Sequence, residues 1–362
     1  MVERMSGLSR EFIIHPGETL KEILEDRHMT QRELALRTGV KEPHVSGIVN
    51  CKKPISASFA KKLEYALGID AMFWVNLQAN YDKELADYEE YNQISGKETA
   101  VLQVLATVTT WAKEEGLLAD DVQGPALVIE WRKLLNVSNL ERLSELSQVG
   151  AYRLATVEKV DPYILLAWLK VCDVLMGREH VHHALDLSML RQRLPMIRML
   201  TFEDIDTIRF KLKHYFAECG IKFAIVKHIP GAPVHGVITR NKDDTLSLVM
   251  TVRRKYADIF WFTLFHEIGH ILNGDITDRL VDFETASTEV ERRANEFAAD
   301  VLIDPEKYSA FVAASELDLP HIRQFCAKQS IPPYILIGRL QRDKYLTYTQ
   351  YASEKVRYHL DL

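Results

Sequence analysis

The stretch TQRELALRTGVKEPHVSGIVNCKKPIS, residues 30–56, decides the fold of the N-terminal part of the chain. Thr30 is expected to cap a helix, and Glu33 three residues later completes a capping box. Gly39 supplies the tight turn that ends this helix. A second short helix is predicted from about Glu42 to Asn50. Two short helices joined by a glycine-containing turn predict a helix-turn-helix.

The second of these helices and the segment after it carry polar and basic side chains at positions expected to face outward. In a helix-turn-helix, the second helix reads base edges, while lysines and helix termini contact phosphates. We therefore expect contacts to double-stranded DNA from six residues: Lys41, His44, Ser46, Asn50, Lys52 and Lys53.

The charge distribution agrees with a nucleic-acid partner for this segment alone. The whole chain of 362 residues has a net charge of −6, which by itself speaks against nucleic acid. Residues 27–62, however, hold eight Lys or Arg against two Glu, a local balance of +6. A solvated charged face is the alternative interpretation of such a basic island. The island and the helix pattern together predict a homodimer on a two-fold operator.

Residues 11–80 resemble the Xre/Cro-type DNA-binding domain, and HPGETLKEILEDRHMTQRELA, residues 15–35, is similar to its HigA-antitoxin branch. The resemblance implies a regulator or antitoxin that binds its operator. Cys51 departs from the family pattern, which usually has Gly there in an NGK turn. The alternative is a helical bundle without a role in DNA binding.

A metal-binding pattern lies in WFTLFHEIGHILNG, residues 261–274. His266 and His270 are four residues apart, so both imidazoles lie on one face of a helix and can reach one ion, with Glu267 beside them. Two neutral imidazoles and a carboxylate suit Zn²⁺ with one position left open. We expect this stretch to bind zinc.

The third zinc ligand is expected from STEVERRANEFAADVLIDP, residues 287–305. Glu291 and Asn295 are i and i+4 neighbours beside the apolar stripe of the predicted helix. Glu291 can point at the metal, while Asn295 can support a ligand histidine. Glu289 and Glu296 are alternative ligands, but both lie well off the stripe and are expected to face water.

The stretches FTLFHEIGH and ERRANEFAADVL resemble the two motifs of the ImmA/IrrE family of zinc metallopeptidases, and the resemblance extends over about residues 203–345. It implies His266, His270 and Glu291 as zinc ligands and Glu267 as the general base. Thr251 stands where many members have Asn. Spacing does not select an oxyanion-stabilising residue between His235 and Tyr256, and both also fit structural roles.

The remaining sequence predicts an α+β protein that is mostly α. We expect a helix-turn-helix bundle at 1–95, a helical linker or sensor region at 96–200, and a zincin-like domain with a small antiparallel sheet at 201–362. In the middle region, Trp111, Trp131 and Trp168 are expected in the core, and the histidines near 180–183 in a solvated loop. The four cysteines are far apart, which predicts reduced thiols in a cytoplasmic protein.

Two function classes follow. The first is a DNA-binding transcriptional regulator with a zinc-dependent endopeptidase domain that cleaves a repressor, a toxin partner or itself. The second is a HigA-like antitoxin or repressor whose zinc domain is a non-catalytic scaffold or sensor. No apolar run reaches the roughly 18 residues that a spanning helix needs, so no membrane partner is expected.

Overall fold

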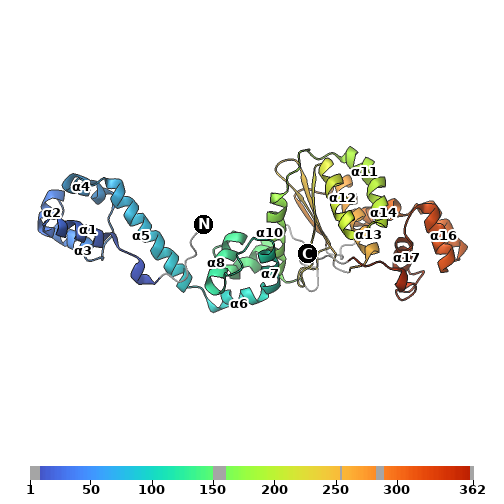
Figure 1. Ribbon diagram of the computed structural model, residues 1–362, viewed down its shortest axis with the longest axis horizontal. Coiled ribbons are helices and arrows are strands. Elements are labelled where there is room, and N and C mark those ends of the chain that lie inside the picture. Colours follow the sequence, from blue (N-terminus) through green and yellow to red (C-terminus); the bar gives the residue numbers. More distant parts are fainter. Residues whose placement is uncertain (1–8, 150–159, 253–254, 283–288, 359–362) are drawn as a thin grey trace. The chain divides into compact units, whose positions relative to one another are not determined.

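The computed structural model describes residues 9–149, 160–252, 255–282 and 289–358, and Figure 1 shows their helices and strands. The chain is mostly helical with one small sheet, which confirms the predicted balance of elements. It forms two compact units. The first comprises residues 1–99 with 123–129, and the second comprises 100–122 with 130–362. The three-part division at residues 95 and 200 stays a prediction.

The first unit is built from helices. A 3₁₀ turn, Arg10–Phe12, precedes them, and two helices, α6 and α8, continue into the second unit. The helices are α1 (Pro16–Asp26), α2 (Gln31–Thr38), α3 (Glu42–Val49), α4 (Ala57–Leu67), α5 (Ala71–Asn92), α6 (Gly96–Val104) and α8 (Gly124–Leu135).

Local sequence signals account for the boundaries of α2. The Thr30 hydroxyl accepts a hydrogen bond from the Glu33 amide at 3.1 Å, and Gly39 ends α2 in the left-handed region with φ of 63°. The Glu33 carboxylate bonds Arg37. Apolar side chains of five helices close a core under α2 and α3, including Leu20, Leu34, Val45, Ile48, Phe59, Leu63 and Trp74. The predicted helix-turn-helix is therefore present.

The second unit contains the remaining helices. Apolar spacing near 3.6 predicts one helix over residues 99–115, but it is broken at Leu105 into α6 and α7. The sequence pattern did not predict α15 and α17. The bounds are α7 (Ala106–Glu114), α9 (Leu143–Val149), α10 (Pro162–Arg178), α11 (Leu187–Met199), α12 (Ile205–Glu218), α13 (Ala257–Asn273), α14 (Glu289–Leu302), α15 (Pro305–Ala314), α16 (Leu319–Gln329) and α17 (Pro333–Arg342), with 3₁₀ turns at Leu140–Arg142, Leu200–Phe202 and Ala352–Glu354.

The sheet has four strands in the order β1-β3-β2-β4: β1 (Ile221–Val226), β3 (Leu246–Thr251), β2 (Gly236–Arg240) and β4 (Arg279–Asp282). The prediction of an antiparallel sheet was wrong, because β1 pairs with β3 in parallel, although β2 is antiparallel to both its neighbours. Alternating residues identify a strand but do not specify its partner. Alternation in IKFAIVKHI, HGVITR and TLSLVMTV predicts β1, β2 and β3, whereas β4 has only four residues and was not predicted.

Helices α12 and α13 pack against this sheet, α12 on β1 and α13 on β2 (Figure 1). Their apolar faces form one core with the sheet and α17, with Phe216, Phe223, Leu248, Trp261, Phe265 and Leu336 among its buried side chains. Strand β3 is buried along its whole length, as expected for a strand paired on both sides. This packing fixes α13, the helix that carries the two histidines.

Other expectations for the chain agree with the structure. Trp111, Trp131 and Trp168 are buried, and the Trp168 indole donates to the Lys227 carbonyl at the end of β1. All four cysteines are free thiols, and Cys51 is the exposed one. Among the helices described, none has the length and apolar character needed to cross a membrane.

Candidate metal centre and nucleic-acid interface

A close packing of α13 on α14 positions the predicted metal ligands. Gly269 makes the approach possible, since an added Cβ would lie 3.1 Å from the Phe297 ring and 3.3 Å from the Cα atom of Ala294. These distances are tighter than ordinary van der Waals contact. The absence of a side chain at Gly269 therefore lets α14 bring Glu291 to the histidine face of α13.

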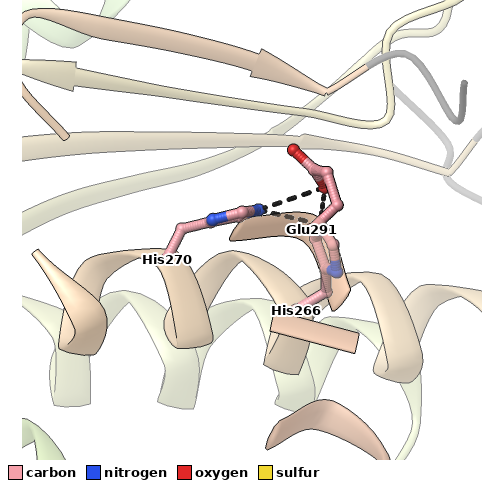
Figure 2. Close-up of side chains that lie close together, drawn as sticks. All are labelled: His266, His270 and Glu291. Atoms are coloured by element: carbon pink, nitrogen blue, oxygen red, sulfur yellow. Dashed lines mark hydrogen bonds and ion pairs between the residues drawn. The ribbon is translucent and has the colours of Figure 1, made fainter. Parts of the chain in front are cut away.

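Three side chains converge at this contact, as Figure 2 shows. The Nε2 atoms of His266 and His270 lie 3.0 Å apart, and Glu291 Oε2 lies 3.1 Å from the first and 3.4 Å from the second. Both histidines are buried and Glu291 is half-buried. In the part of the chain that the structure describes, this is the group of three His, Cys, Asp or Glu side chains suited to a metal ion.

The donor set and its spacing fit zinc. Two imidazole nitrogens and one carboxylate oxygen are a usual ligand set for a zinc site with an open position. A tetrahedral ion with bonds of about 2.0–2.1 Å separates its ligand atoms by about 3.3 Å. The three separations here, 3.0 to 3.4 Å, agree with that value.

Electrostatics hold the Glu291 carboxylate in the form that a metal requires but favour protonation of His270. Hydrogen bonds to His266 and His270 lower the pKa of Glu291 to about 2, so its carboxylate is ionised. Burial lowers the pKa of His270, but bonds to Glu291 and Asp275 outweigh it and leave the pKa raised. Protons and metal therefore compete for this imidazole.

Asp275 supports the His270 ring. Its Oδ2 atom lies 3.0 Å from His270 Nδ1, and its other oxygen accepts from Arg293 at 3.3 Å. Because an ionised carboxylate can only accept, Nδ1 carries the proton and Nε2 keeps its lone pair for a metal. The sequence pattern did not predict a role for Asp275, although this residue directly follows the Asn273-Gly274 end of the helix.

Asn295, expected to support a histidine, does not do so in this structure. Its side-chain oxygen accepts a hydrogen bond from Arg342 at 3.2 Å. The carboxylate that supports a ligand histidine comes from Asp275, five residues after His270, rather than from α14. The alternative ligands, Glu289 and Glu296, both pair with Arg292 on the exposed face of α14.

Glu267 is fully buried. Its carboxylate lies against the backbone of Gly236, the first residue of β2, where any Cβ would overlap it. Of the other residues considered near the site, Thr251 donates to the Val234 carbonyl, and the Tyr256 hydroxyl accepts from Arg357. Tyr256 is thus engaged away from the histidines.

A cleft of about 350 Å³ opens beside the metal-binding group. His266 and Glu291 line it together with His235, whereas His270 and Glu267 are not among its lining residues. The rest of its wall comes from α13, α14, α17 and the C-terminal segment, with Phe262, Asn295, Arg339, Arg342 and Lys355. The site therefore has room for a ligand next to two of the three donors.

In the first unit, the six residues predicted to contact DNA lie at the N-cap of α3, on α3 and in the turn after it. Lys41, Asn50, Lys52 and Lys53 are exposed. Ser46 and His44 are half-buried; Asn50 donates to the Ser46 hydroxyl at 3.1 Å, and the His44 ring meets Phe59 edge-to-face at 5.1 Å. The structure gathers these residues on one element, and their contacts to DNA stay a prediction.

Cys51 adopts the backbone conformation that favours glycine. Its φ is 58°, in the left-handed region, and the amides of Lys52 and Lys53 both donate to the Gly47 carbonyl. The family pattern with Gly at this position is explained by this turn. Cys51 therefore adopts the conformation of this turn at a cost in backbone strain.

Comparisons with known proteins concern this first unit. The sequence model of the family described as helix-turn-helix matches residues 20–74. The virulence-associated protein I of Dichelobacter nodosus is 33% identical over 78 residues, which are 21% of this chain and 72% of that protein. The chain belongs to the helix-turn-helix family.

Solved structures of helix-turn-helix relatives cover a similar share of the chain. The Pseudomonas aeruginosa antitoxin HigA, solved with the higBA promoter, is 36% identical, covers 23% of this chain and 90% of its own, and has a TM-score of 0.22. An addiction module antidote protein of a HigA family from Coxiella burnetii is 25% identical, covers 31% and 96%, and has a TM-score of 0.20. The evidence for the metal centre is therefore the geometry of its own side chains.

Proposed function

We propose that this protein is a DNA-binding transcriptional regulator whose second unit is a zinc-dependent endopeptidase. The protein substrate is a repressor, a toxin partner or the chain itself. The convergence of His266, His270 and Glu291 at the wall of a cleft carries the enzymatic part of the proposal.

The DNA-binding part is supported by the helix-turn-helix and its local charge. Four of the six proposed contact residues are exposed, in a segment whose balance is +6 within an acidic chain. Lys52 and Lys53 would contact phosphates, and Ser46 and Asn50 would contact base edges. A homodimer on a two-fold operator would use two such surfaces.

The enzymatic part assigns roles to residues of the second unit. His266, His270 and Glu291 would hold zinc, which when bound supplies a Lewis acid that activates water and polarises a carbonyl. Asp275 holds His270 in the tautomer that leaves Nε2 unprotonated. Glu267 would take a proton from water and pass it to the leaving amine. The likeness of both motifs to ImmA/IrrE peptidases supports these roles.

One observation favours a second candidate function, a HigA-like antitoxin or repressor with a non-catalytic zinc scaffold or sensor. Glu267 is fully buried against Gly236 and does not line the cleft. A general base must come within hydrogen-bond reach of the proton that it removes, although such contacts often tighten only when substrate binds. The catalytic function therefore requires Glu267 to gain access to water.

Cleavage of an unstructured protein such as β-casein by the purified full chain tests the proposal. Glu267→Gln should lower the rate about 10²- to 10⁴-fold while zinc content, measured by mass spectrometry, stays the same. Glu296→Gln, an exposed glutamate on the same unit, is the matched control and should cleave normally. Zinc-loaded protein that cleaves nothing would favour the scaffold function, and equal cleavage by Glu267→Gln would remove Glu267 as the base.

A further inference from the structure

Three cationic side chains line the cleft beside the metal-binding group, and two of them have acidic partners. Lys355 lies 2.8 Å from Asp258, with both side chains below 10% exposed, and Arg339 lies 2.6 Å from Asp343. Arg342 differs, since within the described residues no carboxylate lies at ion-pair distance from it. Its hydrogen bond goes to the neutral amide oxygen of Asn295 at 3.2 Å.

The position of Arg342 relates it directly to the metal ligands. Its guanidinium stacks on the Phe262 ring, 3.8 Å from the centroid, and Phe262 lies four residues before His266 on α13. Asn295 lies four residues after Glu291 on α14. Four residues advance a helix by about 6 Å. Arg342 therefore contacts α13 and α14 about one turn away from the proposed metal ligand on each helix.

Stacking and the bond to Asn295 fix the guanidinium plane and leave its other N–H groups for a ligand. A guanidinium presents its donors as a fork that matches a carboxylate, and such charge-assisted bonds are roughly twice as strong as neutral ones. We propose that Arg342 binds a carboxylate of the peptide substrate, about two residues from the bond that is cleaved. The spacing follows because an extended peptide advances about 3.3 Å per residue.

This inference rests on the proposed peptidase function for its substrate, and two sources of the carboxylate are chemically equivalent. An internal Asp or Glu side chain would make the enzyme selective within a protein segment. A free C-terminal carboxylate would place cleavage two residues from the end of a chain. In both cases the bound group is an anion at Arg342, and peptides that carry one or the other distinguish them.

Fluorescence anisotropy with labelled decapeptides tests the assignment, using the zinc-loaded full chain with Glu267→Gln to prevent turnover. The probes are a peptide of Ala, Ser and Gly with one central Glu and blocked ends, the same peptide with Gln, and the Gln peptide with a free C-terminus. We expect one carboxylate-bearing peptide to bind about tenfold more tightly than the blocked Gln peptide.

Variants of Arg342 decide whether that preference arises at this residue. Arg342→Gln should remove the tenfold preference, and Arg342→Lys should restore part of it, because lysine keeps the charge but not the fork. Arg209→Gln, an exposed arginine on α12 outside the cleft, is the control and should keep it. Zinc content equal to that of the parent confirms that each variant is folded at the site.

The result that overturns the inference is a zinc-loaded protein whose carboxylate and Gln peptides bind equally, or not at all, or whose preference survives Arg342→Gln. These outcomes are separable from failure of the proposed function. Casein cleavage without a carboxylate preference would leave the peptidase intact and remove the role of Arg342. If the protein never cleaves but its carboxylate preference depends on Arg342, the role of Arg342 would stand and the peptidase function would be removed.

Discussion

The helix pair α2–α3 and the helix pair α13–α14 both present functional side chains, but they do so in opposite environments. In the first pair, the six residues lie on α3 and its flanks within thirteen consecutive positions, 41–53, and four of them are exposed. The second brings together side chains from two separate helices, and its two histidines are buried. Exposed charges are screened and each adds little free energy, whereas buried converging donors depend on one another.

The difference predicts how the two regions respond to substitution. At the exposed surface, many contacts contribute to the affinity for DNA, so the loss of one or two lowers that affinity only gradually. At the buried group, each donor occupies a position that no neighbour can replace.

Removing one donor should abolish the metal site. His266→Ala leaves His270 and Glu291 as a two-ligand site, and we expect more than about a hundredfold loss of zinc affinity, beyond that typical of a supporting residue. Zinc content after purification and competition with a chelator measure it. His321→Ala, which changes an exposed histidine on α16, is the control. Full zinc occupancy in His266→Ala would show that the ion binds elsewhere.

Removing the support of a donor should have a smaller effect. Asp275→Ala leaves all three donors in place but no longer fixes the proton on His270 Nδ1. We expect zinc affinity to fall about 10- to 100-fold without loss of the fold. Chelator competition gives the affinity, and circular dichroism checks the helices. Affinity unchanged from that of the parent would mean that the hydrogen bond does not orient the ring.

The exposed surface should respond gradually and in a salt-dependent way. Replacing Lys52 and Lys53 together by Gln should weaken binding to every DNA sequence and lower the slope of log affinity against log salt by about 1.8, or 0.9 for each phosphate contact. Titrations of labelled duplexes at several salt concentrations measure this slope.

The exposed Lys328 and Lys344 of the second unit, replaced together, supply the control of equal charge. Changes at Ser46 or Asn50 should instead alter sequence preference. A lysine pair that altered preference and left the salt slope intact would contradict the proposed division between phosphate and base contacts.

The smallest effect concerns the backbone of the turn after α3. Cys51→Gly should stabilise it by about 0.5–1 kcal/mol, because Gly avoids the cost of the left-handed region but loses more entropy on folding. Hydrogen exchange across residues 42–53 should slow about two- to fivefold. Ser58→Gly, a substitution within α4, should instead be destabilising and make hydrogen exchange faster. Faster exchange in Cys51→Gly would show that the cysteine side chain stabilises the turn.

The two regions also differ in how much of their structure can be predicted from the sequence. For α2–α3 the deciding signals are local: Thr30 caps the helix, Gly39 ends it, and both do so in the structure. For α13 the i, i+4 spacing of His266 and His270 predicted that both histidines lie on one face of one helix. It could not give the approach of α14, which depends on Gly269 meeting Ala294 and Phe297 in three dimensions.

What sequence reasoning missed is long-range or depends on packing. Asp275 was overlooked because its role appears only when the chain turns at Gly274 toward the His270 ring. Asn295 was assigned to a histidine on helical spacing alone, but Arg342 from α17, a helix that was not predicted, takes its side-chain oxygen. The parallel pairing of β1 with β3 likewise follows from tertiary contacts and not from alternation.

Anomalous diffraction at the zinc edge, from crystals of the full chain grown with Zn²⁺, would locate the bound ion. We expect one strong peak in the second unit, about 2.0–2.2 Å from Nε2 of His266, Nε2 of His270 and a carboxylate oxygen of Glu291. The same crystals of His266→Ala should lack the peak. A zinc-saturated protein without density between these three side chains, or with the ion bound by other residues, would contradict the account.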